Sequence, residues 1–216
     1  MNKIRKYFVF EPLWWWFLRI AIITVMSVGM QCFTAFDPLI IFLVMVTSVG
    51  MLEIVVDFWF FGAIGKKGFV QFEYLKTSKR GIQILKGALY IGAVWNLIEL
   101  LLVFVINIVV PMVMQGNLQA NMRSGMALLG LIFCVWFLEM LGVTIGRICD
   151  GVMINTGVAM GGMVLAIFFL IAALNYPAII LVVAVALAVP MMIFGINFVL
   201  KRVRESYYDE RVKVRV

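Results

Sequence analysis

The chain has 216 residues, of which 65% are apolar and only 13% are charged, and its formal net charge is +7. This composition excludes a soluble globular protein, because a chain with so much apolar and so little charged surface is solvated by lipid. Spans of about 20 residues with short loops fit about six helices into this length and leave no room for a large aqueous domain. We therefore expect an all-α integral membrane protein with six transmembrane helices.

Residues 1–12 are predicted to form a short, amphipathic, cytoplasmic N-terminal segment that carries three basic residues. The next residues, Trp14, Trp15 and Trp16, are typical of the aromatic belt at a membrane interface. A cleaved signal peptide is not expected. The apolar run is longer than a signal core, contains Arg19 and offers no small-residue cleavage site.

The predicted transmembrane domain covers residues 13–200 and consists of six apolar spans separated by short polar connections. Polar turns or loops place the ends of these spans near Phe36, Gly62, Met112, Ile145, Leu174 and Leu200. The third span is expected to begin near Gly87, and Pro190 is expected to kink the sixth. Residues 201–216 are predicted to form a basic cytoplasmic tail.

The distribution of cations predicts the orientation, since Lys and Arg near span ends are retained in the cytoplasm. With six spans, all of the eighteen Lys and Arg residues except Arg123 fall on one side. Both termini are therefore expected in the cytoplasm of a multi-pass protein of the plasma membrane. Topology and contact with anionic membrane lipids account for the positive charge, and we expect no nucleic-acid partner.

Ionisable residues inside the predicted spans are the candidate functional residues, because a charge in hydrocarbon needs a partner or a water-filled cavity. They are Arg19, Glu53, Asp57, Glu99 and Glu139. Glu53 and Asp57 are four residues apart and share a helical face. Arg19 is expected to pair with Asp57 or Glu139, which lie toward the cytoplasmic end. The acids either hold helices together or line a proton or substrate pathway.

The sequence lacks several signatures of catalysis and nucleotide binding. It contains no histidine, and residues 62–68 have the wrong spacing for a phosphate-binding loop. The three cysteines show no paired spacing that would indicate a disulfide framework or a metal site. We therefore expect a protein that is not an enzyme, holds no cofactor or metal of its own and does not itself bind ATP.

The polar stretch at residues 62–86 is the longest interruption between apolar spans and carries six cations. Apolar side chains recur in it at helical spacing beside Glu73, which predicts a short surface helix that contains Phe69, Phe72, Tyr74 and Leu75. Ser78 is expected to cap the helix that follows. A basic loop that faces lipid head groups is the alternative interpretation of this stretch.

The segment from Tyr74 to Gly87 resembles the loop that follows the second span in ABC-2-type permeases of ATP-binding cassette transporters. The residues that match are Leu75, Ser78, Lys79, Arg80, Ile82, Leu85, Lys86 and Gly87. Lys76 stands where the family often has a proline. Six spans, cytoplasmic termini and a short amphipathic N-terminus also agree with this family.

The resemblance implies a permease subunit of an exporter that moves a hydrophobic or amphipathic substrate, such as a peptide or a lipid-like molecule. A separate ATPase subunit would bind ATP and receive the coupling helix within residues 62–86. By the same resemblance, the residues that couple the two subunits are Phe69, Phe72, Glu73, Tyr74 and Leu75. A second permease, either another copy of this chain or a similar protein, would complete the transporter.

Two other classes of membrane protein remain open. A substrate-binding subunit of an energy-coupling-factor importer has a similar size, but residues 21–29 supply few of the small residues that this class places on its first span. An integral membrane enzyme of lipid metabolism would need acids or histidines clustered at an interface, whereas the acids here are spread over three predicted helices.

Overall fold

The structure is a computed structural model, and it describes residues 13–33, 38–61, 78–114, 122–148 and 152–213. The elements in these ranges are all helical, and no strand occurs among the described residues. The predicted all-α class is therefore confirmed. In chain order the elements are α1 (Leu13–Phe33), α2 (Pro38–Phe61), α4 (Lys79–Phe104), the π-helical segment η3 (Val105–Val109), α5 (Val110–Met114), α6 (Met122–Ile148), α7 (Val152–Asn175) and α8 (Pro177–Lys213).

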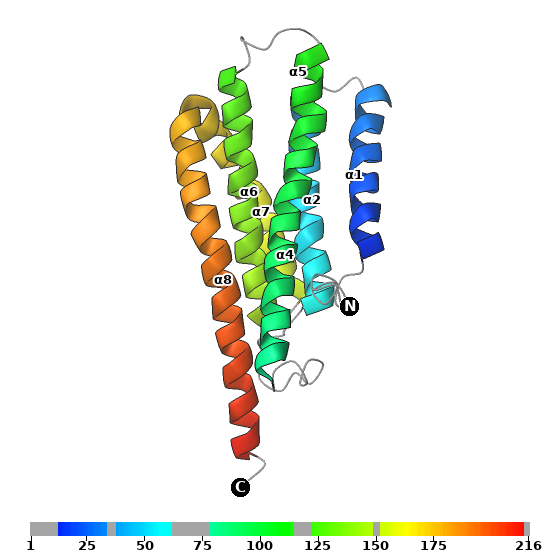
Figure 1. Cartoon of the computed structure of the whole chain (residues 1–216). Coiled ribbons are helices and arrows are strands. Elements are labelled where there is room, and N and C mark those ends of the chain that lie inside the picture. Colours follow the sequence, from blue (N-terminus) through cyan, green and yellow to red (C-terminus); the bar gives the residue numbers. More distant parts are fainter. Residues whose placement is uncertain (1–12, 34–37, 62–77, 115–121, 149–151, 214–216) are drawn as a thin grey trace.

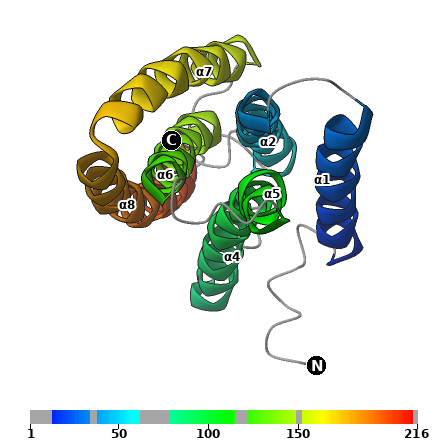
Figure 2. The same ribbon diagram turned by 90° about the horizontal axis from the view of Figure 1, so that it is seen from above.

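The helices form a bundle in which α6 has the central position. It packs against α8, α7, α2 and α4, and it is the most buried of the apolar helices. Helix α1 lies at the periphery beside α2 and α4 (Figure 2). Figure 1 shows that α1 begins, α4 begins and α8 ends at the same end of the bundle.

Five helices in the described part of the chain are long and apolar enough to cross a membrane. Their apolar segments are Leu13–Cys32, Leu39–Asp57, Lys79–Val109, Gly125–Ile148 and Pro177–Glu205. In α7 the corresponding apolar segment, Met160–Asn175, is shorter. Large apolar side chains such as Phe17, Phe168 and Val182 are exposed on the outside of the bundle. Such a surface suits lipid, and the length and composition of the helices are those of a multi-pass membrane protein.

The third span begins earlier than the sequence indicated. Helix α4 starts at Lys79, eight residues before the expected Gly87. Ser78 caps it as predicted, because its Oγ accepts a hydrogen bond from the Gly81 N–H at 2.9 Å. The polar residues after the cap are compatible with a helix, so polarity alone did not mark its boundary.

The sixth span also continues beyond its expected end near Leu200. Helix α8 runs to Lys213 and passes through Pro190 without interruption. Residues 201–213 contain neither Gly nor Pro, so nothing in them stops the helix. With 37 residues, α8 is about 55 Å long at 1.5 Å per residue, whereas the hydrocarbon layer is about 30 Å thick. The first part of the basic tail is therefore a helical extension of the span.

Glycines allow α6 and α8 to pack closely. A Cβ atom on Gly130 would lie 3.4 Å from the backbone of Leu181, and one on Gly195 would lie 2.3 Å from Thr144 Oγ1. The Thr144 hydroxyl donates a hydrogen bond to the Met140 carbonyl at 2.7 Å, which fixes the position of Oγ1. Small residues at such contacts bring membrane helices together.

Replacing Gly195 with alanine is expected to lower stability by about 1–2 kcal/mol, because the new methyl group displaces the Thr144 hydroxyl. Gly92→Ala is the matched control, since a Cβ there meets no atom within 4 Å. Adding Thr144→Ala to Gly195→Ala should recover part of the loss. The thermal midpoint in detergent micelles measures the effect, and equal midpoints for the two glycine variants would refute it.

Candidate functional site: a buried charged cluster

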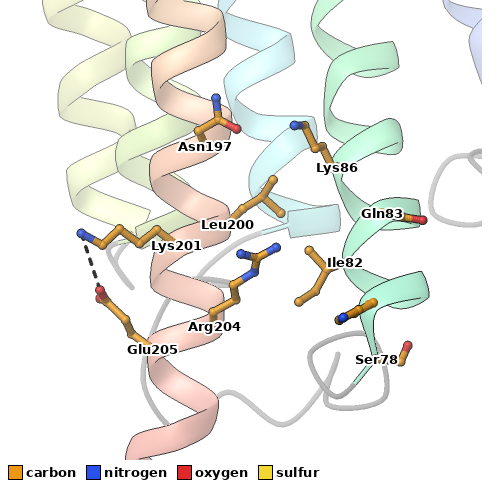
Figure 3. Close-up of a pocket in the computed structure, with 10 residues that line it drawn as sticks. Ser78, Ile82, Gln83, Lys86, Asn197, Leu200, Lys201, Arg204 and Glu205 are labelled. Atoms are coloured by element: carbon orange, nitrogen blue, oxygen red, sulfur yellow. Dashed lines mark ion pairs between the residues drawn. The ribbon is translucent and has the colours of Figure 1, made fainter.

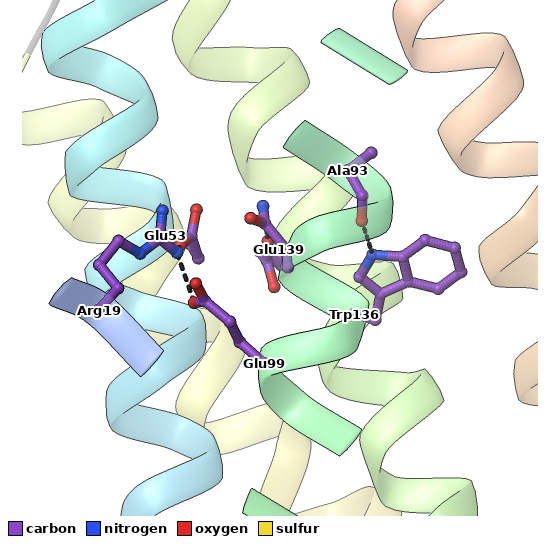
Figure 4. Close-up of polar contacts among 7 residues, drawn as sticks. Arg19, Glu53, Ala93, Glu99, Trp136 and Glu139 are labelled. Atoms are coloured by element: carbon purple, nitrogen blue, oxygen red, sulfur yellow. Dashed lines mark hydrogen bonds and ion pairs between the residues drawn. The ribbon is translucent and has the colours of Figure 1, made fainter. Parts of the chain in front are cut away.

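Arg19 is the centre of a charged cluster inside the bundle. Its side chain, on α1, is only 3% exposed and forms ion pairs with Glu53 on α2 and Glu99 on α4 (Figure 4). The distance from Arg19 Nη2 to Glu99 Oε2 is 2.5 Å. One guanidinium thus joins three helices, as the planar, multidentate shape of arginine allows.

The helical periodicity of α1 explains why Arg19 points inward. The buried side chains of α1 recur at Trp16, Arg19, Ile23 and Ser27, which all lie on one face, whereas most of its other side chains are exposed. The guanidinium therefore points into the bundle and is shielded both from lipid and from water. A charge in this position needs anionic partners, and the two glutamates supply them.

Glu139 on α6 lies in the same region of the bundle (Figure 4). It is 1% exposed, and its Oε1 accepts a hydrogen bond from Asn96 Nδ2 on α4 at 2.6 Å. Its other oxygen, Oε2, has no hydrogen-bond partner among the described residues. Nearby, Trp136 Nε1 donates to the Ala93 carbonyl at 3.0 Å and adds a second polar link between α6 and α4.

A second buried ion pair joins α6 to α2. Arg147 Nε donates to Asp57 Oδ2 at 3.0 Å, and Arg147 Nη2 is paired with Asp57 Oδ1, so the contact is bidentate. Both side chains are buried. A bidentate arginine–carboxylate pair is among the stronger and more directional polar contacts in proteins.

The predicted partner of Arg19 was wrong. The sequence indicated Asp57 or Glu139, but Arg19 pairs with Glu53 and Glu99, and Asp57 pairs with Arg147. With the fourth span expected to end near Ile145, Arg147 falls by sequence in the polar connection that follows. In the structure α6 continues through Gly146 to Ile148, which turns Arg147 into the bundle. A single glycine lowers helix propensity but does not end a helix that is held by tertiary contacts.

The cluster also contains Asn96, which the sequence analysis did not single out. It lies three residues before Glu99, so both side chains point to the same side of α4. Asn96 reaches Glu139 on α6, while Glu99 reaches Arg19 on α1. The signal that was available is the i, i+3 spacing of two polar residues inside an apolar span.

Carboxylates outnumber cations in the described interior. Four acids (Glu53, Asp57, Glu99 and Glu139) share two guanidinium groups, so full ionisation would leave two uncompensated negative charges. Within the ranges described, no three His, Cys, Asp or Glu residues are grouped so as to hold a metal ion. Protons or small external cations are the species that would balance these charges.

A smaller polar contact holds α1 to the π-helical segment η3. Gln31 Nε2 donates to Asn107 Oδ1 at 2.9 Å and to the Ile106 carbonyl at 3.1 Å. Asn107 Nδ2 lies 3.3 Å from Ser27 Oγ. A π-helical turn changes the pairing of backbone carbonyls, and these side chains supply partners at that point. Helix α1 is therefore held to α4 by the Arg19–Glu99 pair and, further along, to η3 by the Gln31–Asn107 contact.

The predicted coupling residues Phe69, Phe72, Glu73, Tyr74 and Leu75 lie outside the described residues, and so does the N-terminal segment 1–12. In comparisons with known proteins, no family model, no curated protein and no solved structure matches the chain. The resemblance to ABC-2-type permeases therefore stays a hypothesis based on one short motif.

Proposed function

We propose that the chain is a membrane transport protein, the permease subunit of an ATP-binding cassette exporter whose ATPase is a separate chain. The observation that supports this proposal most directly is the position of α4. The helix begins at Lys79, its cap Ser78 directly follows the stretch 62–77, and the part of the permease-like motif from Ser78 to Gly87 occupies this cap and the first turns. The same helix carries Asn96 and Glu99 into the charged cluster.

A displacement at the start of α4 would be transmitted to two other helices of the bundle, α1 and α6. From Lys79 to Glu99 the helix is about 30 Å long, and a helix of this kind moves as a rod. Its contacts inside the bundle are polar and specific: Glu99 holds α1 through Arg19, and Asn96 holds α6 through Glu139. ATP-driven movement of the loop would therefore change the packing of α1 and α6 around α4, which is the kind of motion that alternating access requires.

The proposal includes a membrane topology. We infer that α7 also crosses the bilayer, although its described apolar segment is short, so that the chain makes six spans. The shared position of the start of α1, the start of α4 and the end of α8 at one end of the bundle agrees with this topology (Figure 1). By the positive-inside rule that end, which carries the basic helix end of α8, faces the cytoplasm of a plasma-membrane protein.

The partners follow from the same proposal. The chain works with an ATPase subunit and with a second permease, either another copy or a similar protein, and the substrate is hydrophobic or amphipathic. A gene for an ATPase with Walker motifs beside the gene for this chain would supply the partner for the experiment below.

Replacing Phe72 and Leu75 together with aspartate is expected to abolish association with that ATPase, because an unpaired carboxylate in an apolar groove costs several kcal/mol. The measurement is co-purification of the ATPase with the tagged permease. Gln71→Asp with Thr77→Asp is the matched control, since it adds the same charge to the same segment at polar positions. Wild-type permease and the control should retain the ATPase, and the permease alone should show no ATP turnover.

One outcome of this co-purification experiment would contradict the prediction. Retention of the ATPase and of substrate-stimulated ATP turnover by the Phe72→Asp, Leu75→Asp variant would make the loop a lipid contact only. The permease proposal would then lose its main support.

A further inference from the structure

A pocket of about 880 Å³ lies between the first turns of α4 and the end of the apolar part of α8 (Figure 3). Four cationic side chains line it: Lys79 and Lys86 from α4, and Lys201 and Arg204 from α8. Glu205 is the only acidic residue among the described lining residues. The volume is in the range of small-molecule binding sites, and the charge favours an anion.

The positive charge of this pocket is only partly neutralised by the protein. Glu205 is shared, because its carboxylate lies 3.9 Å from Lys201 Nζ and 3.7 Å from Nη1 of Arg202, which is outside the pocket. Lys79 and Arg204 form no ion pair with another described residue. The N-terminus of α4, capped by Ser78, adds the positive end of a helix dipole to the same pocket.

The surroundings of the pocket change from charged to apolar along both helices. On α8, residues at positions 204, 201 and 197 line the pocket, and the same face continues to Ile193 and Phe194, which are 44% and 63% exposed. On α4, the face that carries Lys86 continues to Val94, which is 47% exposed. Along both helices the side chains therefore change from cations that line the pocket to exposed apolar residues on the adjoining turns.

We propose that this pocket binds the phosphate-bearing head group of an anionic phospholipid, with its acyl chains against Ile193, Phe194 and Val94. The cations match the phosphate, and basic pockets between helices at a membrane surface bind lipid head groups in this way. The adjoining apolar face distinguishes a lipid from a soluble phosphate compound, which would gain nothing from exposed Phe194. The position also fits, since Lys201 is the first charged residue after the uncharged run 177–200 of α8, and lipid head groups lie where such a run ends.

The pocket offers a matched pair of variants. Lys79→Gln with Arg204→Gln removes two cations that line the pocket. Arg80→Gln with Arg202→Gln removes two exposed cations from the same two helices, at residues outside the pocket lining. Both double variants change the net charge by the same amount, so a difference between them reports the pocket itself.

Native mass spectrometry of the purified chain in an uncharged detergent tests the proposal, with added phosphatidylglycerol as the probe. Phosphatidylcholine with the same acyl chains and soluble glycerol phosphate are the comparison ligands. We expect phosphatidylglycerol to bind best and to bind about 30-fold more weakly to the Lys79→Gln, Arg204→Gln variant, while the control variant changes little. No ATPase is needed, so the outcome is independent of the proposed transport function.

Three results would overturn the proposal. Equal loss of phosphatidylglycerol binding in both double variants would indicate a general effect of surface charge. Equal binding of phosphatidylcholine, whose phosphate is balanced by a choline cation, would show that the pocket does not select an anionic head group. Binding of glycerol phosphate as tightly as phosphatidylglycerol would assign the pocket to a soluble phosphate compound.

Discussion

Replacing Arg19 with glutamine is expected to destabilise the bundle by about 3–5 kcal/mol, one of the largest effects of any single substitution in the described part of the chain. The variant leaves Glu53 on α2 and Glu99 on α4 buried without the guanidinium that pairs with both. Removing one member of a buried ionic cluster costs much more than the cluster contributes, because the remaining charges stay out of water. Unfolding of the purified protein in detergent micelles, by heat or by denaturant, measures the loss.

A rescue variant keeps this prediction testable if Arg19→Gln alone does not fold. Combining it with Glu53→Gln and Glu99→Gln removes all three charges and should restore most of the stability. Arg19→Lys keeps the charge but loses the planar fork, so we expect an intermediate loss. A neutral triple variant that is no more stable than Arg19→Gln would mean that Arg19 acts through packing and not through its charge.

The same triple variant separates a structural role of the cluster from a functional one. If the neutral triple variant folds and still supports substrate-stimulated ATP turnover with the partner ATPase, the charges only hold α1, α2 and α4 together. If the variant folds and binds the ATPase but no longer transports substrate, the charges line the substrate pathway or control its opening. The two alternatives that the sequence left open for these acids thus lead to different measurements on one protein.

Much of the fold could be predicted from hydropathy and from local signals. Helix α2, Pro38–Phe61, ends within one residue of the expected Gly62, because the apolar run of the sequence stops at that glycine. Ser78 caps α4 for a local reason, which is that its Oγ can reach a free backbone N–H of the first turn. Such features depend on neighbours in the sequence and are readable from it.

The partners inside the cluster could not be predicted in the same way. Periodicity shows that Glu53 and Asp57 share a face of α2, but it does not show which helix that face meets or how that helix is rotated. In the structure Glu53 meets α1 and Asp57 meets α6. The π-helical turn at Val105–Val109 is equally invisible in the hydropathy pattern, since it changes backbone pairing and not composition.

The position of the end of α6 explains why the partner of Asp57 was not predicted. The same position is the basis of the second large expected effect. Arg147 lies in the last turn of α6, where the sequence had suggested a polar connection, and its buried guanidinium holds Asp57 of α2 by two contacts. Replacing Arg147 with methionine is expected to cost about 3 kcal/mol, since it leaves the Asp57 carboxylate buried without its cation. Asp57→Asn removes the carboxylate of the same pair and should also lower the stability.

A double-mutant cycle on this pair separates the interaction from the two burial costs. We expect Asp57→Asn with Arg147→Met to be clearly more stable than the sum of the single losses predicts, with a coupling energy of about 2–3 kcal/mol. The exposed pair Lys201 and Glu205, 3.9 Å apart on the surface of α8, is the control and should show a coupling of about 0.5 kcal/mol or less. Unfolding free energies of the four proteins in each cycle provide the measurement. Equal coupling in the two cycles would mean that water reaches Asp57 freely, and the contact between α2 and α6 would then depend on their apolar side chains alone.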